Sequence, residues 1–319
     1  MPVISFPAAG HPLPAVQMAA IPIQKGHRTS AIRGRTLSTA AVYIKPRTLP
    51  EALAALASVN ARILSGGTDF YPALGDRVVR DPVVDLSALS DLRGIALDGE
   101  FFRVGGLTTW TDVIRASLPR CFDALKSAAR EVGSVQIQNR GTVAGNLCNA
   151  SPAADGVPPL LALDAEVELV STSGPRRLKL EQFIVGNRKT ERRPDEILTA
   201  ILVPRGLENA PSTFLKLGAR RYLVISIAMV AAVVATDEAG RVAEARIAVG
   251  SCSAVARRLR KLENDLVGGR VQAGFDGVIR AEHLSSLSPI NDVRATAEYR
   301  MDAALILVQR ALNACAGIA

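Results

Sequence analysis

Two stretches of this sequence place glycine beside hydroxyl, amide and carboxylate side chains, a combination that suits a phosphate-containing ligand. The first, ILSGGTDFYP at residues 63–72, is an apolar run that ends in Gly66 and Gly67. The second, QNRGTVAGNLCNASPAAD at residues 138–155, precedes a predicted helix. Glycine permits close approach of another group to the backbone, so each stretch indicates a point of close contact.

Both stretches supply the hydrogen-bonding groups that a nucleotide needs. Glycine-rich turns leave backbone N–H groups exposed, and these attract phosphate oxygens. Hydroxyl and amide donors, and carboxylates that accept from ribose hydroxyls, come from Thr68, Thr142, Ser151, Asn146, Asn149, Asp69 and Asp155. Either stretch alone is typical of an ordinary turn or loop, whereas the two together favour a nucleotide-like ligand of unspecified kind.

The familiar phosphate-binding and metal-binding spacings are missing. Neither stretch matches G-x-G-x-x-G, and G-x-x-x-x-G-K-[ST] does not occur, which argues against a Rossmann or P-loop site. The four cysteines have no C-x-x-C spacing, and the three histidines lie far apart in the sequence. We therefore predict that this chain holds no metal ion and no iron–sulfur cluster of its own.

Length and composition indicate a soluble globular protein of one large or two ordinary domains. The chain has 319 residues, of which 48% are hydrophobic and 21% charged. The longest apolar run, Leu223 to Ala235, is too short to span a bilayer, and we predict that it is buried core. The net charge of +8 allows a nucleic-acid partner, but 4% aromatic residues leave few stacking platforms. The arginine pairs are scattered, which favours a solvated surface with a few cations for anionic ligands or partner subunits.

The positioning elements are a mixture of helices and strands without regular βαβ alternation, which predicts an α+β fold. A capping box, TLPE at 48–51, opens a helix, and a hairpin is expected around Asp98-Gly99. Helices are expected from about 110 and 121, and from 295 to 314. Strands are expected at 61–64, 82–87, 165–171, 196–204, 212–220 and 241–251.

The first 38 residues differ from the rest, because they are proline-rich and contain no acidic residue. We predict a poorly ordered extension; a start codon placed too far upstream, with Met18 as the alternative, and a transit peptide are the other interpretations. No secretory signal opens the sequence, so a cytoplasmic location is expected. A change in composition near 208–212 suggests a domain boundary.

Four motifs together resemble the FAD-binding subunit of the molybdenum hydroxylase family, which includes xanthine dehydrogenase and carbon monoxide dehydrogenase. In order along the chain they are SGGTD, IQNRGTVAGNLCNASPAAD, FIVGNRKTERRPDEILT and DVRATAEYRMDAALILVQRAL. The resemblance covers roughly residues 41–312 and leaves the N-terminal extension outside.

The resemblance implies a two-lobed FAD-binding domain of the xanthine dehydrogenase/vanillyl-alcohol oxidase type over residues 39–208. A smaller α+β C-terminal domain would follow over 211–315. The implied cofactor is FAD. The implied partners are a large subunit with the molybdenum cofactor and a small [2Fe–2S] subunit in a hetero-oligomer, and this would explain why the chain lacks cluster cysteines.

The resemblance also implies site residues. The first stretch would wrap the FAD diphosphate, with room provided by its double glycine: Ile63, Leu64, Ser65, Gly66, Gly67, Thr68 and Asp69. The second would complete the cradle as a loop: Gly141, Thr142, Val143, Ala144, Gly145 and Asn146. Asp155 would lie near the cofactor, and Leu198 and Lys216 would contact it. No catalytic residue and no metal ligand is implied.

Some of these residues have simpler explanations. Lys216 lies in an apolar strand and could be a surface lysine whose stem packs on the protein. Asp155 could be the N-cap of the helix GVPPLLAL. Cys148 invites a covalent flavin link, but packing as a small buried hydrophobe is the commoner role of such a cysteine. No histidine lies in either stretch, so we expect FAD to be bound non-covalently.

Two departures from the family pattern concern the electron acceptor. Asn187 stands where a tyrosine commonly precedes Arg-Lys-Thr, and Tyr222, Leu223 and Val224 stand where an acidic pair often follows the arginines. These changes leave FAD binding intact and put NAD in doubt as the acceptor.

Three functional hypotheses follow. The first is an electron-transfer subunit of an oxidoreductase, which passes electrons from an iron–sulfur subunit through FAD to an external acceptor. The second is a self-sufficient flavin oxidase or dehydrogenase, for which the sequence offers no histidine or tyrosine constellation near the two stretches. The third is a nucleotide- or nucleic-acid-binding module without a redox role. The substrate of a complex would be selected by another subunit and stays open.

Overall fold

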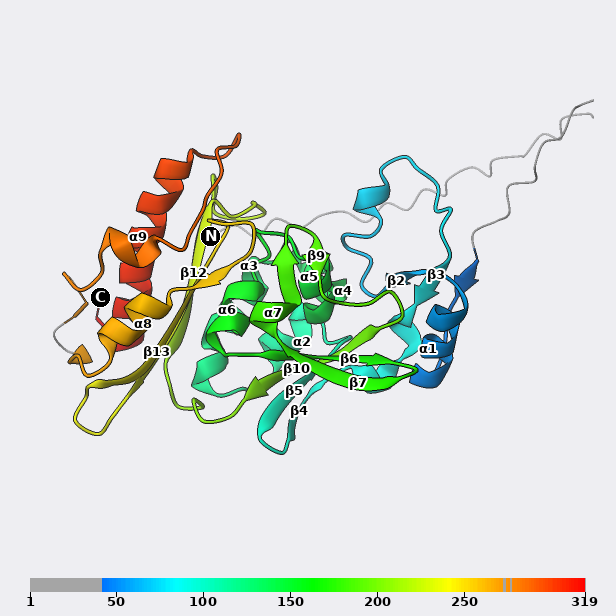
Figure 1. The fold of residues 1–319 in the computed structure, drawn as a ribbon, viewed down its shortest axis with the longest axis horizontal. Coiled ribbons are helices and arrows are strands. Elements are labelled where there is room, and N and C mark those ends of the chain that lie inside the picture. Colours follow the sequence, from blue (N-terminus) through cyan, green and yellow to red (C-terminus); the bar gives the residue numbers. More distant parts are fainter. Residues whose placement is uncertain (1–41, 272–273, 276, 319) are drawn as a thin grey trace, which may run out of the picture. The chain divides into compact units, whose positions relative to one another are not determined.

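The computed structural model describes residues 42–271, 274, 275 and 277–318 (Figure 1), and the predicted extension over residues 1–38 lies outside this part of the chain. Residues Ala40–Ala319 form one compact unit, to which the following description is confined.

A small parallel sheet leads into the first glycine stretch. Its strands β1 (Tyr43–Ile44), β3 (Val83–Asp85) and β2 (Arg62–Leu64) are adjacent in that order, and helix α1 (Leu49–Ser58) connects β1 to β2. The predicted cap is present, because the Thr48 side chain accepts a hydrogen bond from the backbone N–H of Glu51. The Glu51 carboxylate accepts from the N–H of Arg47 at 2.8 Å. Strand β2 ends at Leu64, two residues before Gly66.

An antiparallel sheet of five strands follows, with the order β4-β5-β10-β6-β7. The predicted hairpin joins β4 (Ile95–Asp98) to β5 (Phe101–Gly105), and Gly99 in its turn has a φ of 57°. The central strand, β10 (Ile197–Pro204), is buried almost throughout. Strands β6 (Glu166–Ser171) and β7 (Gly174–Lys179) form the other edge. Leu198 on β10 is thereby held on a rigid element.

Short helices carry the second glycine stretch and its surroundings. The α-helices are α2 (Trp110–Arg115), α3 (Asp123–Glu131), α4 (Val135–Arg140), α5 (Val143–Asn149), α6 (Val157–Ala162) and α7 (Leu180–Phe183). Strands β8 (Ile184–Gly186) and β9 (Lys189–Thr190) pair as a two-stranded ribbon. Short 3₁₀ segments lie at Pro72–Leu74, Leu86–Ala88, Ser90–Leu92, Arg120–Phe122 and Ala281–Leu284.

The C-terminal part is an antiparallel sheet between helices. Its strands are β11 (Ser212–Leu217), β12 (Ala228–Thr236), β13 (Val242–Gly250) and β14 (Arg257–Arg258). Helices α8 (Arg260–Leu266) and α9 (Ala297–Ala316) pack on one side of this sheet, and α3 and α6 pack on the other (Figure 1). Strand β12, covered on both faces, is buried over nearly its whole length.

The predicted burial of the whole apolar run from Leu223 to Ala235 is wrong at its start. Only the part from Ala228 onward enters β12. Leu223 is 56% exposed and Ile225 is 52% exposed, because the segment before the strand runs along the surface. Leu223 also has a φ of 51°, a left-handed conformation that is uncommon for leucine.

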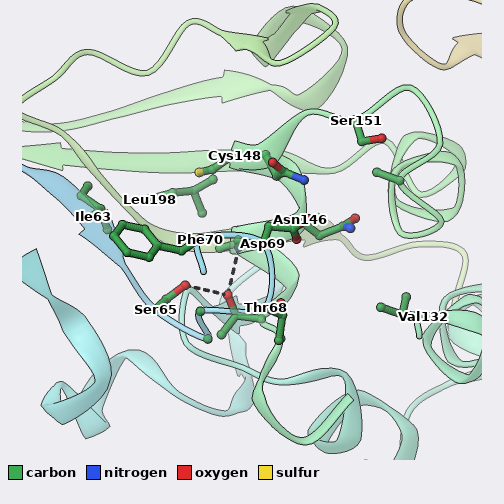
Figure 2. Close-up of a pocket in the computed structure, with 18 of the residues that line it drawn as sticks. Ile63, Ser65, Thr68, Asp69, Phe70, Val132, Asn146, Cys148, Ser151 and Leu198 are labelled. Carbon is green, nitrogen blue, oxygen red and sulfur yellow. Dashed lines mark hydrogen bonds between the residues drawn. The ribbon is translucent and has the colours of Figure 1, made fainter. Parts of the chain in front are cut away.

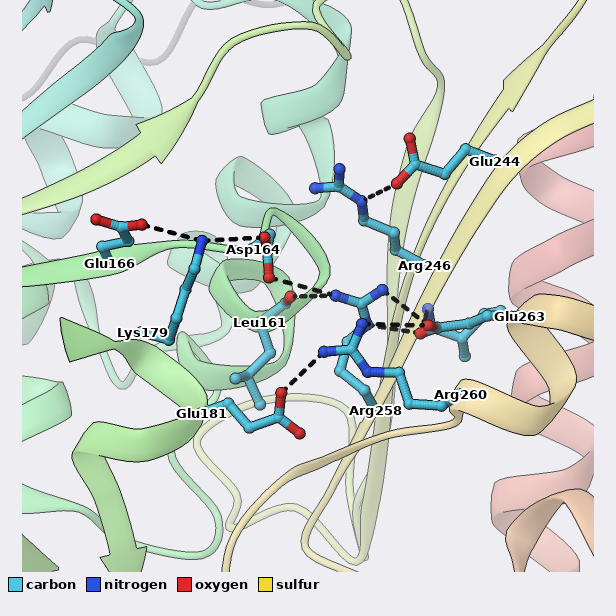
Figure 3. Close-up of polar contacts among 11 residues, drawn as sticks. Leu161, Asp164, Glu166, Lys179, Glu181, Glu244, Arg246, Arg258, Arg260 and Glu263 are labelled. Carbon is cyan, nitrogen blue, oxygen red and sulfur yellow. Dashed lines mark hydrogen bonds and ion pairs between the residues drawn. The ribbon is translucent and has the colours of Figure 1, made fainter.

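A buried ion pair ties the C-terminal sheet to α6 (Figure 3). Arg258 donates to Glu263 through Nε at 2.6 Å and Nη2 at 2.8 Å, and through Nη1 to the carbonyl of Leu161 at 3.3 Å. Glu263 also accepts from the backbone N–H of Ile247 at 2.8 Å. Both side chains are less than a tenth exposed, so water could not solvate either charge if its partner were removed.

We predict that Glu263→Gln strongly destabilises the fold, because it removes the buried carboxylate of Arg258 and leaves only the half-exposed Asp164 carboxylate, at 3.8 Å, to balance the buried guanidinium. The free energy of unfolding, measured by urea titration, should fall by about 3 kcal/mol or more. Glu244→Gln is the matched control. Its carboxylate pairs with Arg246 at 2.6 Å but is 45% exposed, so its loss should cost less than about 1 kcal/mol. Equal effects of the two substitutions would contradict the prediction.

Candidate cofactor site

A cavity of about 1240 Å³ is lined by both glycine stretches. Further lining comes from β10, from the β8–β9 ribbon and from the surface segment Leu223–Ile225. Figure 2 shows Phe70 and Ile63 on one side of the Ser65 hydroxyl in that view, and Val132 and Ser151 on the other. The tertiary structure thus brings residues more than 70 positions apart in the sequence to one site.

The two glycine stretches pack directly against each other. The Ser65 and Thr142 hydroxyl oxygens lie 3.3 Å apart. A Cβ placed on Gly66 would overlap the backbone carbonyl of Arg140 and would lie 3.0 Å from the Cα of Gly141. The space at Gly66 is therefore filled by the chain's own backbone. This corrects the interpretation that Gly66 leaves room for a pyrophosphate: it lets the two stretches close on each other.

Gly67 is required for a different reason. Its φ is 76°, in the left-handed region that favours glycine, and a Cβ there would lie 2.8 Å from the ring of Tyr71. The turn at Gly67 reverses the chain directly after Gly66. It is this reversal that presents the following backbone to the cavity.

The backbone N–H groups of the first stretch are available to a ligand. From Gly66 to Phe70, none of the five consecutive N–H groups donates a hydrogen bond to any residue in the described ranges. Backbone donors almost always find a partner, and a run of N–H groups in a turn is a preferred environment for an anion. The first stretch can therefore donate several hydrogen bonds to a phosphate group in the cavity.

The second stretch is not the loop that the sequence predicts. Residues Val143–Asn149 form helix α5, and Thr142 is its N-cap, with its hydroxyl accepting from the N–H of Gly145 at 2.9 Å. The Thr142 cap outweighs the poor helix propensity of Gly145 and Asn146. A Cβ on Gly145 would lie 2.8 Å from the Thr142 hydroxyl, so glycine makes this tight cap possible.

Asn146 provides an amide beside the cavity. Its Oδ1 is buried and has no hydrogen-bond partner in the described part of the chain, and the residue lines the cavity. A buried polar atom without a partner costs free energy unless a ligand or water supplies the bond. Among the described residues, the N–H donors of the first stretch and this amide oxygen acceptor are without partners, and together they fit a ligand that carries both phosphate and hydroxyl groups.

Asp155 and Lys216 form a buried ion pair at the cavity wall, with Asp155 on the cavity side. Lys216 Nζ lies 2.7 Å from one carboxylate oxygen of Asp155, and the Ser226 hydroxyl donates to the other at 2.7 Å. Burial raises the pKa of Asp155, and the Lys216 ammonium opposes that rise. The Lys216 side chain is 7% exposed, so the alternative of a surface lysine is wrong. Asp155 is not the N-cap of α6 either, because Gly156 occupies that position.

The predicted site residues divide into those that line the cavity and those that support it. Leu64 and Val143 are buried in the core, and Lys216 lies behind Asp155. The other predicted residues line the cavity: Ile63, Ser65, Gly66, Gly67, Thr68, Asp69, Gly141, Thr142, Ala144, Gly145, Asn146, Asp155 and Leu198. Cys148 lines it as well, and burial raises the pKa of its thiol to about 11, which keeps it protonated at neutral pH.

Several lining residues were not predicted. Trp110, the only tryptophan of the chain, is 1% exposed and packs under Gly141 and Gly156. Arg188, with a φ of 55°, lines the cavity and donates to the Asn149 side chain. It lies in the motif GNRKT, which could have directed attention to it. Arg62 and Phe70 also line the cavity; Phe70 lies within the first stretch but was not among the predicted site residues, and no sequence signal marks Arg62.

Two family models match the chain in succession. Residues 35–206 match the FAD binding domain in molybdopterin dehydrogenase, and residues 213–315 match the CO dehydrogenase flavoprotein C-terminal domain. The fold and the cavity thus define an FAD-binding protein with a C-terminal domain of the carbon monoxide dehydrogenase flavoprotein type.

The sequence is 35% identical to the nicotinate dehydrogenase FAD-subunit of Eubacterium barkeri, over 71% of this chain and 79% of that protein. It is 33% identical to the xanthine dehydrogenase FAD-binding subunit of Escherichia coli O157:H7, over 82% of this chain and 91% of that protein. A chain of carbon monoxide dehydrogenase from Hydrogenophaga pseudoflava superposes with a TM-score of 0.80 at 26% identity, covering 86% of this chain and 96% of that one.

The chain belongs to the FAD-binding subunits of the molybdenum hydroxylase family. The predicted α+β fold, the FAD cofactor and the oxidoreductase class are confirmed. Among the described residues, no helix combines the length and the apolarity needed to cross a bilayer.

We predict that Asn146→Ala weakens FAD retention by about one to two decades in Kd, because an amide beside the cofactor is lost at a cost of about 1–3 kcal/mol. Fluorescence titration of the deflavinated protein would measure the change. Asn139→Ala is the control, since Asn139 is exposed and bonds to Thr111 outside the cavity. Unchanged affinity in Asn146→Ala would exclude Asn146 from the site.

We predict that Gly66→Ala lowers both the thermal midpoint and FAD affinity, because the new methyl group would collide with the Arg140 carbonyl and separate the two stretches. Gly186→Ala is the control, because a Cβ there would meet only the Lys189 side chain at 3.7 Å, an ordinary contact. A Gly66→Ala protein with the wild-type thermal midpoint and FAD affinity would show that the close contact between Gly66 and the Arg140 carbonyl is not needed.

Proposed function

We propose that the chain binds FAD non-covalently in this cavity and serves as the electron-transfer subunit of a molybdenum-containing hydroxylase or dehydrogenase complex. The observation that carries the proposal is the run of N–H groups from Gly66 to Phe70, which have no acceptor among the described residues and lie beside a cavity of about 1240 Å³. A diphosphate has two negative charges and many acceptor atoms, which matches this donor set.

The residues of the cradle have distinct parts in this proposal. The N–H groups from Gly66 to Phe70 would donate to the diphosphate, and the Asn146 Oδ1 would accept a hydrogen bond from the cofactor. Leu198 forms an apolar wall. Asp155 is a positioning residue, because Lys216 and Ser226 fix both of its oxygens. We also propose the domain limits 39–208 and 211–315, which the ranges of the two family models support.

Non-covalent binding is supported by the side chains around the cavity. In the described part of the chain, no histidine lines it, and burial raises the pKa of the Cys148 thiol to about 11. A protonated thiol is a poor nucleophile, so neither residue type that commonly attaches to flavin is available in reactive form.

FAD, when bound, supplies the redox chemistry, and the chain's own residues bind and orient it. The three acidic residues that line the cavity in the described part of the chain are poorly placed for acid–base work on a substrate. Asp155 is held in its ion pair, the Glu131 carboxylate lies 3.8 Å from the Arg221 guanidinium, and Asp69 is exposed. In the described residues no three His, Cys, Asp or Glu side chains are grouped to hold a metal ion. Substrate chemistry and the relay of electrons are therefore assigned to partner subunits.

The proposed partners are a large subunit with the molybdenum cofactor and a small [2Fe–2S] subunit. This is supported by the names of similar proteins, which are an FAD-subunit, an FAD-binding subunit and a medium chain. The names of these relatives refer to different compounds, namely nicotinate, xanthine and carbon monoxide, so the similarity does not identify the substrate of this protein's complex. We propose a cytoplasmic location, supported by the four cysteines, all of which are free thiols.

We predict that acid precipitation of the purified protein releases a yellow chromophore into the supernatant, and that dithionite reduces the flavin of the isolated chain. The same protein should not reduce its flavin with xanthine, nicotinate or an aldehyde, and addition of the two partner subunits should restore reduction by the substrate of the complex. Absorbance at the flavin maximum under anaerobic conditions would measure each step. Direct bleaching by an organic substrate in the isolated chain would support a self-sufficient dehydrogenase instead, and colour kept in the acid pellet would contradict non-covalent binding.

A further inference from the structure

We infer that Arg62 and Phe70, two residues outside the predicted cradle, bind the adenosine half of the cofactor. The inference rests on the proposed function, since it takes the diphosphate to lie at the turn between them. The two residues flank that turn in the chain, because Arg62 begins strand β2 and Phe70 directly follows Asp69.

The two side chains form a preassembled platform. The guanidinium carbon of Arg62 lies 4.3 Å from the centroid of the Phe70 ring, and both residues line the cavity. The Phe70 ring also packs against Tyr71, with centroids 5.3 Å apart and planes at 79°. A cation over an aromatic face is held by the charge distribution of the ring, so the two flat groups keep a fixed orientation beside the cavity.

The guanidinium N–H groups of Arg62 have no acceptor among the described residues. Its side chain is part-buried, yet within the described ranges it forms no hydrogen bond or ion pair. The buried Arg258, by contrast, is bonded to Glu263 and to the Leu161 carbonyl. A guanidinium offers five N–H donors in a plane. An adenine ring suits this arrangement, because it stacks on flat groups and its ring nitrogens accept hydrogen bonds.

Asp69 indicates which half of the cofactor belongs here. Its carboxylate lines the cavity, is exposed and has no side-chain partner in the described chain. A free carboxylate beside a phosphate-binding turn suits a ribose diol, which donates two hydrogen bonds. Asp155, elsewhere in the cavity, already has both oxygens bonded. The carboxylate that can accept from a ribose diol, that of Asp69, therefore belongs to the residue next to Phe70 in the chain.

The rest of the cavity wall suits the flavin ring. Leu223 and Ile225 line the cavity and are more than half exposed, so the site borders the surface at this segment. An electron-transfer subunit must let redox partners reach the flavin ring, whereas the adenosine half needs no such access. The Arg62–Phe70 platform is therefore assigned to adenosine.

The test compares ligands that contain one half of the cofactor or both. Deflavinated full-length protein and its Phe70→Ala and Arg62→Gln variants would be titrated with FAD, FMN and ADP, with circular dichroism as the check of folding. We expect FAD and ADP to bind about tenfold or more weakly in both variants, and FMN affinity to change less than twofold. Val78→Ala and Arg80→Gln are the controls, since both residues are exposed in the same loop and neither lines the cavity; they should bind all three ligands as the wild type does.

Each other outcome overturns the inference in a recognisable way. Equal loss of FAD and FMN affinity would place the flavin ring on the platform, as would weaker FAD binding with unchanged ADP binding. Wild-type affinity for FAD and ADP in both variants would mean that the platform touches no ligand. A wild-type protein that binds none of the three ligands would refute the proposed function itself, which is a separate result from any variant effect.

Discussion

The contact between Gly66 and the Arg140 carbonyl is the constraint on which the cofactor site depends. Two backbone segments approach so closely there that only glycine fits, and the Ser65 and Thr142 hydroxyls meet beside it at 3.3 Å. Because Gly66 and Gly67 are used to close this contact and turn the chain, the backbone N–H groups from Gly66 to Phe70 have no acceptor in the part of the chain that the structure describes. The site is thus an unsatisfied backbone segment held in place by packing, and a bound anion can supply the missing hydrogen bonds.

The C-terminal sheet contributes to this site through two buried charge pairs. Lys216 on β11 reaches Asp155 between α5 and α6, and Ser226 before β12 holds the other carboxylate oxygen. Arg258 on β14 reaches the Leu161 carbonyl of α6 while it is paired with Glu263. A buried ion pair gives little net stability, but the loss of one partner is costly because the other charge remains buried. These pairs therefore specify how the C-terminal sheet and α6 meet, and they fix Asp155 beside the cavity.

The segment before β12 is held in a strained conformation at the cavity wall. Leu223 has a left-handed φ of 51°, and the Arg220 side chain donates to the carbonyls of Tyr222 and Leu223. A Cβ on Gly218 would collide with the Val224 side chain, so this segment also folds back tightly on itself. Strain of this kind persists only where surrounding contacts determine the conformation, and here it places apolar side chains along the cavity.

The sequence by itself determined the class of the protein, because the residues that recognise the cofactor lie in short motifs of consecutive residues. The four motifs in order were sufficient to predict the family and FAD, and the mixture of helix and strand patterns without βαβ alternation predicted the α+β fold. Local rules also located the Thr48 cap and the hairpin at Gly99, since each depends on a few neighbouring residues.

The tertiary structure alone decided what each residue does, because these roles depend on partners distant in the chain. Nothing local shows that Gly66 faces Arg140, that Lys216 is paired with Asp155 61 positions away, or that the Arg62 guanidinium lies over the Phe70 ring. The helix at Val143–Asn149 was mistaken for a loop because a single Thr142 cap outweighs glycine and asparagine in its first turns. Close approach, burial and pairing are properties of the packed chain, and a linear sequence specifies them only through the fold.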